Sequence, residues 1–214
     1  MNTNVNFEAP VAALTLLGSG FLILVTAIVL LQSLIVRKTW RAKIILLAMV
    51  VIIALYGSAL LGFSLASHYK LLARGEEKHF CELDCHLAYS VVTVSQSAAP
   101  ANAFPQLNPT VVTIKTRFDE TTIAPWRGNG LLYPNSRELT LFDDRGNRYP
   151  SGSQTSTPLT TPLRPGEFYT TDIVFNLPTG AKASKLLINE GDWITHLVIG
   201  HENSPLHKKT EFQL

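Results

Sequence analysis

Two uncharged runs joined by a short basic turn decide the fold of this chain. They read VAALTLLGSGFLILVTAIVLLQSLIV (residues 11–36), RKTWRAK (residues 37–43) and IILLAMVVIIALYGSALLGFSLA (residues 44–66). A helix needs about 20 apolar residues to cross a bilayer, and each run is longer than that. The sequence therefore predicts two transmembrane helices, over 11–36 and 44–66, that form a tight hairpin.

The basic turn predicts the orientation of this hairpin. Four of its seven residues are Lys or Arg, whereas residues 1–10 carry one acid and no cation. Short loops rich in Lys and Arg stay on the cytoplasmic side of a membrane. We therefore expect a bacterial inner membrane protein with both termini on the periplasmic side. A cleaved signal peptide is disfavoured, because the first run is too long for its apolar region and follows no basic segment.

Small residues recur along both expected helices. Such residues let helix backbones approach closely in lipid, so we expect a packing face, either within the hairpin or against a partner subunit. Neither run contains an ionisable residue, which argues against a proton path, an ion channel or a transporter. The small residues recur every four positions at Ala54, Ser58, Gly62 and Ala66, and every seven at Ala12, Ser19, Thr26 and Ser33.

Charge and composition exclude other classes. The chain has 214 residues, of which 46% are hydrophobic and 16% charged, with a net charge of +2. Residues 67–214 hold 14 Lys and Arg against 15 Asp and Glu, so the excess positive charge lies in the membrane turn. Balanced, scattered charge provides no basic surface for nucleic acid. The apolar content also excludes a disordered protein.

After the second apolar run the pattern changes from helical to β. Residues 67–74 are expected to continue the helix into a juxtamembrane connector over residues 67–86. Short β-branched runs separated by turns then predict an extracytoplasmic, immunoglobulin-like antiparallel β-sandwich over residues 87–214. Its expected strands are 87–95, 110–118, 137–142, 168–177, 185–189, 193–199 and 210–213.

One part of this domain resembles a known family. Leu163-Arg-Pro-Gly-Glu167 leads into a strand that ends Val174-Phe-Asn-Leu-Pro178, which resembles the bacterial immunoglobulin-like domains of unknown function related to a secreted mycobacterial antigen. The closing stretch from Ile199 to Lys209 is similar to segments of uncharacterised bacterial membrane proteins. The resemblance implies a sandwich with a binding or structural role, and it carries over no catalytic residue.

A second similarity, to cytochrome oxidase subunit II, concerns topology alone. That family also has an external N-terminus, a helical hairpin and an external β domain, and its dicopper motif is Cys-x3-Cys followed by a His and then a Met. Here Cys81 and Cys85 have that spacing, but His86 follows at once and no Met occurs after Met49. The chain is therefore not identified as that subunit.

The two cysteines and the adjacent histidine are the sharpest chemical feature. In an extended strand Cys81 and Cys85 would lie roughly 13 Å apart, too far for a disulfide, so the chain must turn if the sulfurs meet. Four alternatives stay open. They are a local disulfide favoured by an oxidising exterior, a copper or zinc site, an expanded haem c attachment motif and two free thiols. The metal site would use Cys81, Cys85 and His86, with His79, His201 or His207 as a further ligand.

Sequence motifs give no enzymatic signal. No Gly-rich phosphate loop, HExxH motif or external GxSxG motif occurs. We therefore expect a non-catalytic accessory or assembly subunit without a cofactor, whose partners are the bilayer and another membrane protein. The alternative is a copper- or zinc-binding or electron-transfer subunit that uses Cys81, Cys85 and His86.

Overall fold

The computed structural model describes residues 2–81, 85–97, 107–123, 127–154 and 157–214. The chain forms two compact units, each assembled from segments that are distant in sequence. The sandwich unit contains residues 1–4, 68–192 and 209–214, and the helical unit contains residues 5–67 and 193–208. Residues 193–208 of the expected β domain therefore belong to the helical unit.

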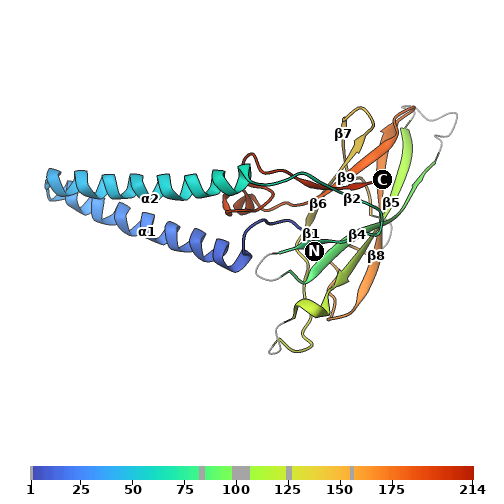
Figure 1. Ribbon diagram of the computed structural model, residues 1–214, viewed down its shortest axis with the longest axis horizontal. Coiled ribbons are helices and arrows are strands. Elements are labelled where there is room, and N and C mark those ends of the chain that lie inside the picture. The colour runs from blue at the N-terminus through green and yellow to red at the C-terminus, as the bar shows by residue number, and fades with distance from the viewer. Residues whose placement is uncertain (1, 82–84, 98–106, 124–126, 155–156) are drawn as a thin grey trace. The chain divides into compact units, whose positions relative to one another are not determined.

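The helical unit is built on a hairpin of two 27-residue helices, α1 (Ala9–Ile35) and α2 (Thr39–Leu65) (Figure 1). Each is about 40 Å long at 1.5 Å per residue, enough for a hydrocarbon core of about 30 Å. The most apolar 18-residue window is 0% buried in α1 and 6% buried in α2. A core helix of a soluble protein would be covered by other elements, so this exposed apolar surface indicates membrane anchoring.

The sandwich unit consists of two five-stranded sheets. A helical hairpin joined to an all-β sandwich is the predicted fold class, which is confirmed. The first sheet has the order β1 (Asn2–Thr3), β3 (Lys78–Phe80), β4 (Leu87–Gln96), β5 (Leu107–Phe118) and β8 (Phe168–Pro178). The second sheet has the order β2 (Lys70–Leu72), β10 (Thr210–Gln213), β9 (Ala183–Glu190), β6 (Arg137–Asp143) and β7 (Arg148–Pro150).

Apolar side chains at every second strand position fill the space between the sheets. In β8 the side chains of Ile173, Phe175 and Leu177 are fully buried, and they alternate with half-buried or exposed neighbours. From the second sheet, β9 and β10 contribute Ile188 and Phe212 to the same apolar cluster. Alternation places one set of side chains on one face of a strand, so the apolar set of β8 is the one that reaches this core.

The sheets are antiparallel except at two short pairings. β1 pairs in parallel with β3, and β2 pairs in parallel with β10. Parallel neighbours require a long crossover connection, and here the hairpin lies between β1 and β3 in the chain. The purely antiparallel sandwich of the prediction is therefore correct for the central strands and wrong for these two pairs.

Two predicted elements are wrong. Residues 193–199 do not form a strand, because Trp193–Leu197 is a 3-10 helix in the helical unit. The second helix does not continue over residues 67–74, since α2 ends at Leu65 and β2 occupies Lys70–Leu72. The expected connector also contributes β3, and three-residue strands are too short to show a period in sequence.

Candidate functional site

The cysteine segment contains a disulfide between Cys81 and Cys85. Their Cα atoms lie 4.0 Å apart, so the extended arrangement is wrong and the local disulfide of the sequence analysis is present. Cys81 is buried, and its backbone N–H donates a 2.8 Å hydrogen bond to Oδ1 of Asn4. The disulfide therefore adjoins the segment that carries β1.

The disulfide changes what the predicted metal ligands can do. Neither cysteine supplies a thiolate while the two sulfurs are bonded to each other, and a thiolate is what copper, zinc or haem attachment needs from a cysteine. Over the described ranges 2–81, 85–97, 107–123, 127–154 and 157–214, no group of three or more His, Cys, Asp or Glu side chains could hold a metal ion.

The histidines near the disulfide have polar partners of their own. Nε2 of His79 lies 3.1 Å from Oδ2 of Asp119. Its buried Nδ1 has no hydrogen-bond partner among the residues that the structure describes. Nδ1 of His86 lies 2.6 Å from Oγ1 of Thr122, and its ring stacks on Phe118 with 5.2 Å between centroids. The structure thus brings His79 together with carboxylates and His86 with a hydroxyl.

The remaining candidates belong to the other unit. His201 is buried in the helical unit, where Nδ1 accepts a 3.0 Å hydrogen bond from the backbone N–H of Asn203. Nδ1 of His207 lies 2.7 Å from the carbonyl oxygen of Lys208. Both side chains are therefore engaged in local contacts within residues 193–208.

An ionic cluster surrounds His79 in the sandwich unit. Arg117 forms a bidentate pair with Glu77, with Nε–Oε1 and Nη2–Oε2 distances of 2.8 and 2.7 Å. Nη2 of Arg117 also lies 3.3 Å from Oδ2 of Asp119. Bidentate, charge-assisted bonds of this kind are the strong ones. Sequence reasoning missed the cluster, because residues 77–79 at the start of β3 and residues 117–119 at the end of β5 are brought together only by the pairing of both strands with β4.

The cluster lowers the pKa of both carboxyl groups. Hydrogen bonding from Arg117 is the main cause of the lowered pKa of Glu77. Burial alone would raise the pKa of Asp119, but hydrogen bonds from Thr121, His79 and Arg117 outweigh burial and lower that pKa well below its usual value. Both groups are therefore held as carboxylates.

Acid should destabilise the sandwich through this cluster. A carboxyl whose pKa is lower in the folded than in the unfolded state, about 4 for Asp and Glu, contributes stability above pH 4 that is lost as pH falls further. Asp119→Asn should lower the free energy of unfolding by roughly 1–3 kcal/mol at pH 7, and reduce the further loss on acidification. Thermal unfolding of the full chain in detergent from pH 7 to 3 checks this. The exposed Asp144→Asn is the control, and an equal response of the two variants would contradict the prediction.

A second polar group lies deep between the sheets. Lys78 is fully buried, and its Nζ donates hydrogen bonds to the carbonyl oxygens of Ile188 (2.8 Å) and Thr210 (3.2 Å). Because Lys78 lies in β3 and its acceptors lie in β9 and β10, this side chain joins the two sheets. The guanidinium of buried Arg137 lies 4.4 Å from the ring centroid of Phe80. One feature of the sequence could have indicated this position: Lys78 and Phe80 are two residues apart, so in a strand their side chains lie on the same face.

The small residues of the helices are not equivalent in the structure. On α1, Ala12 and Ser33 are buried and Ser19 and Thr26 are half-buried. The four residues of the predicted stripe on α2 and its C-cap are all exposed, and a Cβ added at Gly62 would meet no atom within 4 Å. The α2 stripe, Ala54, Ser58, Gly62 and Ala66, is therefore not used by the hairpin.

Residues 193–208 reverse the usual burial of a water-soluble surface. Trp193 is 71% exposed, and Ile194, Leu197 and Leu206 are exposed as well. Backbone N–H groups in this segment bond to carbonyls three residues earlier, which satisfies them locally. Apolar residues outside and satisfied polar groups inside are typical of a segment that borders lipid. The buried polar residues are Thr195, His201, Glu202, Asn203 and Ser204.

Comparison with known proteins finds one similar solved structure. No family model matches the chain and no curated protein matches it, so the resemblances to immunoglobulin-like domains and to cytochrome oxidase are not confirmed. Among solved structures, the chain is similar to an uncharacterized β-sandwich protein from Clostridium difficile 630, with 9% identity and a TM-score of 0.41. The match covers 69% of this chain and 95% of that chain. No residue role follows from it.

Proposed function

We propose that the protein is a non-catalytic, membrane-anchored accessory or assembly subunit whose hairpin binds another membrane protein. The observation that carries this proposal is the exposed small-residue stripe of α2. In lipid, helices associate through close packing, and small residues at four-residue spacing provide the surface for it. Because α1 covers a different face, the stripe remains available to a helix of a partner.

The proposed location is the extracytoplasmic face of a bacterial inner membrane. The basic turn favours a cytoplasmic position for residues 37–43, which leaves the sandwich unit outside. The Cys81–Cys85 disulfide supports an oxidising compartment for that unit. The apolar outer surface of residues 193–208 supports a position of this segment beside lipid.

The proposal of a non-catalytic role is supported by the contacts within the ionic cluster around His79. Glu77, Arg117, Asp119 and His79 are bonded to one another across β3 and β5. Charges paired in this way stabilise a particular strand arrangement. The titratable side chains nearest the disulfide are thus used within the sandwich unit itself.

A matched pair of glycine variants tests the partner surface. Gly62→Leu should abolish copurification of a membrane protein from native membranes in mild detergent, because the added side chain holds a partner helix away. Gly20→Leu, the same change at an exposed position of α1, should leave copurification intact.

A photocrosslinking residue identifies the surface directly. Placed at Ser58 it should give an adduct with the same membrane protein. Placed at exposed Ile53, about 140° around the helix, it should give none. Purification of the unaltered chain as a lone monomer, or equal behaviour of the two glycine variants, contradicts the proposal.

A further inference from the structure

The turn end of the hairpin contains a crevice between the two helices. Its volume is about 310 Å³, at the lower end of the roughly 300–1,000 Å³ typical of small-molecule sites. Half of its lining residues are apolar and half are polar or cationic. They are Val29, Val36, Ile44 and Ile45, and Gln32, Ser33, Lys38 and Arg41.

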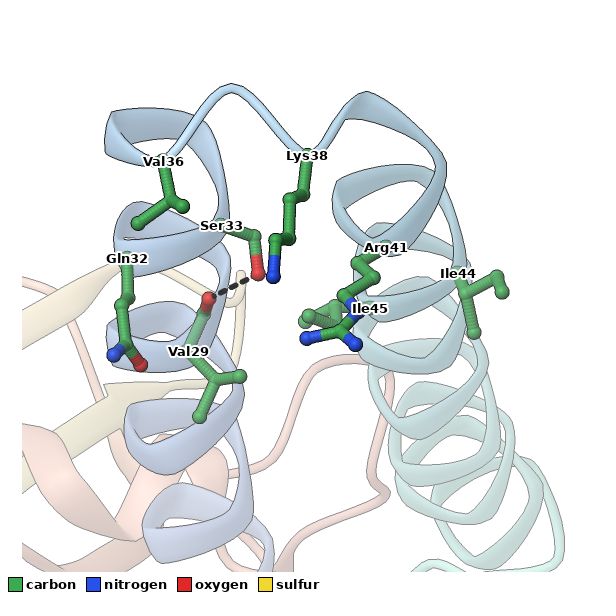
Figure 2. Close-up of a pocket in the computed structure, with 8 residues that line it drawn as sticks. All are labelled: Val29, Gln32, Ser33, Val36, Lys38, Arg41, Ile44 and Ile45. Carbon is green, nitrogen blue, oxygen red and sulfur yellow. Dashed lines mark hydrogen bonds between the residues drawn. The ribbon is translucent and has the colours of Figure 1, made fainter.

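Two cationic side chains enter this crevice from α2 and the turn before it. Figure 2 shows the Lys38 ammonium and the Arg41 guanidinium directed from the turn into the space between the helices. Lys and Arg at the end of a membrane helix ordinarily extend their charged groups outward to water. Here the Lys38 ammonium lies beside Ser33 of α1, and the Arg41 guanidinium lies beside Ile45 of α2.

The protein supplies no counter-charge for these cations. Residues 9–75 contain no Asp or Glu at all. Within the residues that the structure describes, neither Lys38 nor Arg41 takes part in a salt bridge. Both side chains are exposed, so at the membrane boundary each cation is accessible to an anionic headgroup, an attraction of about 1 kcal/mol per Lys or Arg.

We propose that this crevice binds one phospholipid with an anionic headgroup. The phosphate lies against Lys38 and Arg41, and the side-chain amide of Gln32 provides a further polar contact, whereas the Ser33 hydroxyl already donates to the carbonyl oxygen of Val29. The first carbons of the acyl chains lie against Val29 and Ile45. Basic pockets between membrane helices at the water boundary bind anionic headgroups in this way. The proposal requires the hairpin to span a bilayer and does not require the accessory role.

The cations of the turn provide a matched control. Lys38→Gln/Arg41→Gln removes two charges that line the crevice, whereas Arg37→Gln/Lys43→Gln removes two charges from the same turn that do not line it. A general attraction to a negative membrane surface would weaken equally in both variants. A defined site should weaken about thirtyfold in the first, or about fivefold for each cation, and little in the second.

Native mass spectrometry of the full chain in detergent measures the binding. Phosphatidylglycerol, phosphatidylcholine and inorganic phosphate are added separately. One phosphatidylglycerol should bind more tightly than phosphatidylcholine, with the variant dependence given above. Ile45→Trp, which fills the apolar part without changing charge, should also reduce binding, and circular dichroism confirms that each variant retains its helices. Equal loss in the two double variants, equal binding of the two lipids, or displacement of the lipid by inorganic phosphate overturns the proposal.

Discussion

Replacing Lys78 by Met is expected to lower the free energy of unfolding of the sandwich by roughly 2–5 kcal/mol. Met retains the apolar stem but removes the ammonium that donates to the carbonyl oxygens of Ile188 and Thr210. Each buried acceptor that loses its donor costs roughly 1–3 kcal/mol. Chemical denaturation of the full chain in detergent measures the change.

A second lysine in the same sheet provides the control. Lys115 lies in β5, is half-buried, and holds its Nζ 4.3 Å from the ring centroid of exposed Phe168. Lys115→Met removes the same charge and should change the unfolding free energy by less than about 1 kcal/mol. If the two variants lose equal stability, Lys78 acts through its apolar stem alone and the link between the sheets is not important.

Replacing Gly200 by Ala is expected to destabilise the helical unit by roughly 2–5 kcal/mol. Gly200 has a φ of +74°, and an added Cβ would lie 2.5 Å from Cβ of Phe7 and 2.7 Å from Oδ1 of Asn6. The left-handed conformation costs about 1–2 kcal/mol for a residue with a Cβ, and overpacking adds about 1–3 kcal/mol. The change should separate residues 5–7 from residues 193–208.

Gly180→Ala separates the two contributions of that change. Gly180 has a φ of +84° and would meet no atom within 4 Å, so its variant carries only the conformational strain. Thermal unfolding in detergent should therefore show the greater loss for Gly200→Ala. Hydrogen exchange should also accelerate at the amide of Asn6, which donates to the carbonyl oxygen of Gly200 at 2.8 Å. Equal losses would show that Phe7 and Asn6 move aside without difficulty.

The elements that could be predicted from the sequence are those whose hydrophobic pattern follows directly from what surrounds them, lipid or a protein core. The 27-residue helices have long uncharged runs, and β8 has alternating apolar residues that fill a core. Residues 193–199 were wrongly predicted as a strand, because an apolar pattern does not tell whether the side chains face a protein core or the outside. Their apolar side chains resemble those of a strand facing a core, whereas Trp193, Ile194 and Leu197 face outward.

The polar contacts could not be predicted, because they depend on register between distant strands. Lys78 follows two acidic residues and reads as a surface position. Only the pairing of β3 with β4 carries it between the sheets. Glu77 and Arg117 are likewise brought together by β4, which lies between their strands. Of the candidate site, the sequence indicated the cysteine pair and left its chemistry open, since side-chain geometry decides between a disulfide and free thiolates.

The parallel pairings of β1 with β3 and of β2 with β10 have a consequence for biogenesis. β1 is synthesised before the hairpin, and its partner strand emerges only after both helices have been made. β2 waits still longer, because its partner β10 comprises residues 210–213. The β1–β3 pair can therefore form only after the hairpin has been made, and the second sheet lacks its β2–β10 pair until residues 210–213 have been made. During this interval the unpaired strand edges are exposed to aggregation, and this is the stage at which a chaperone would bind.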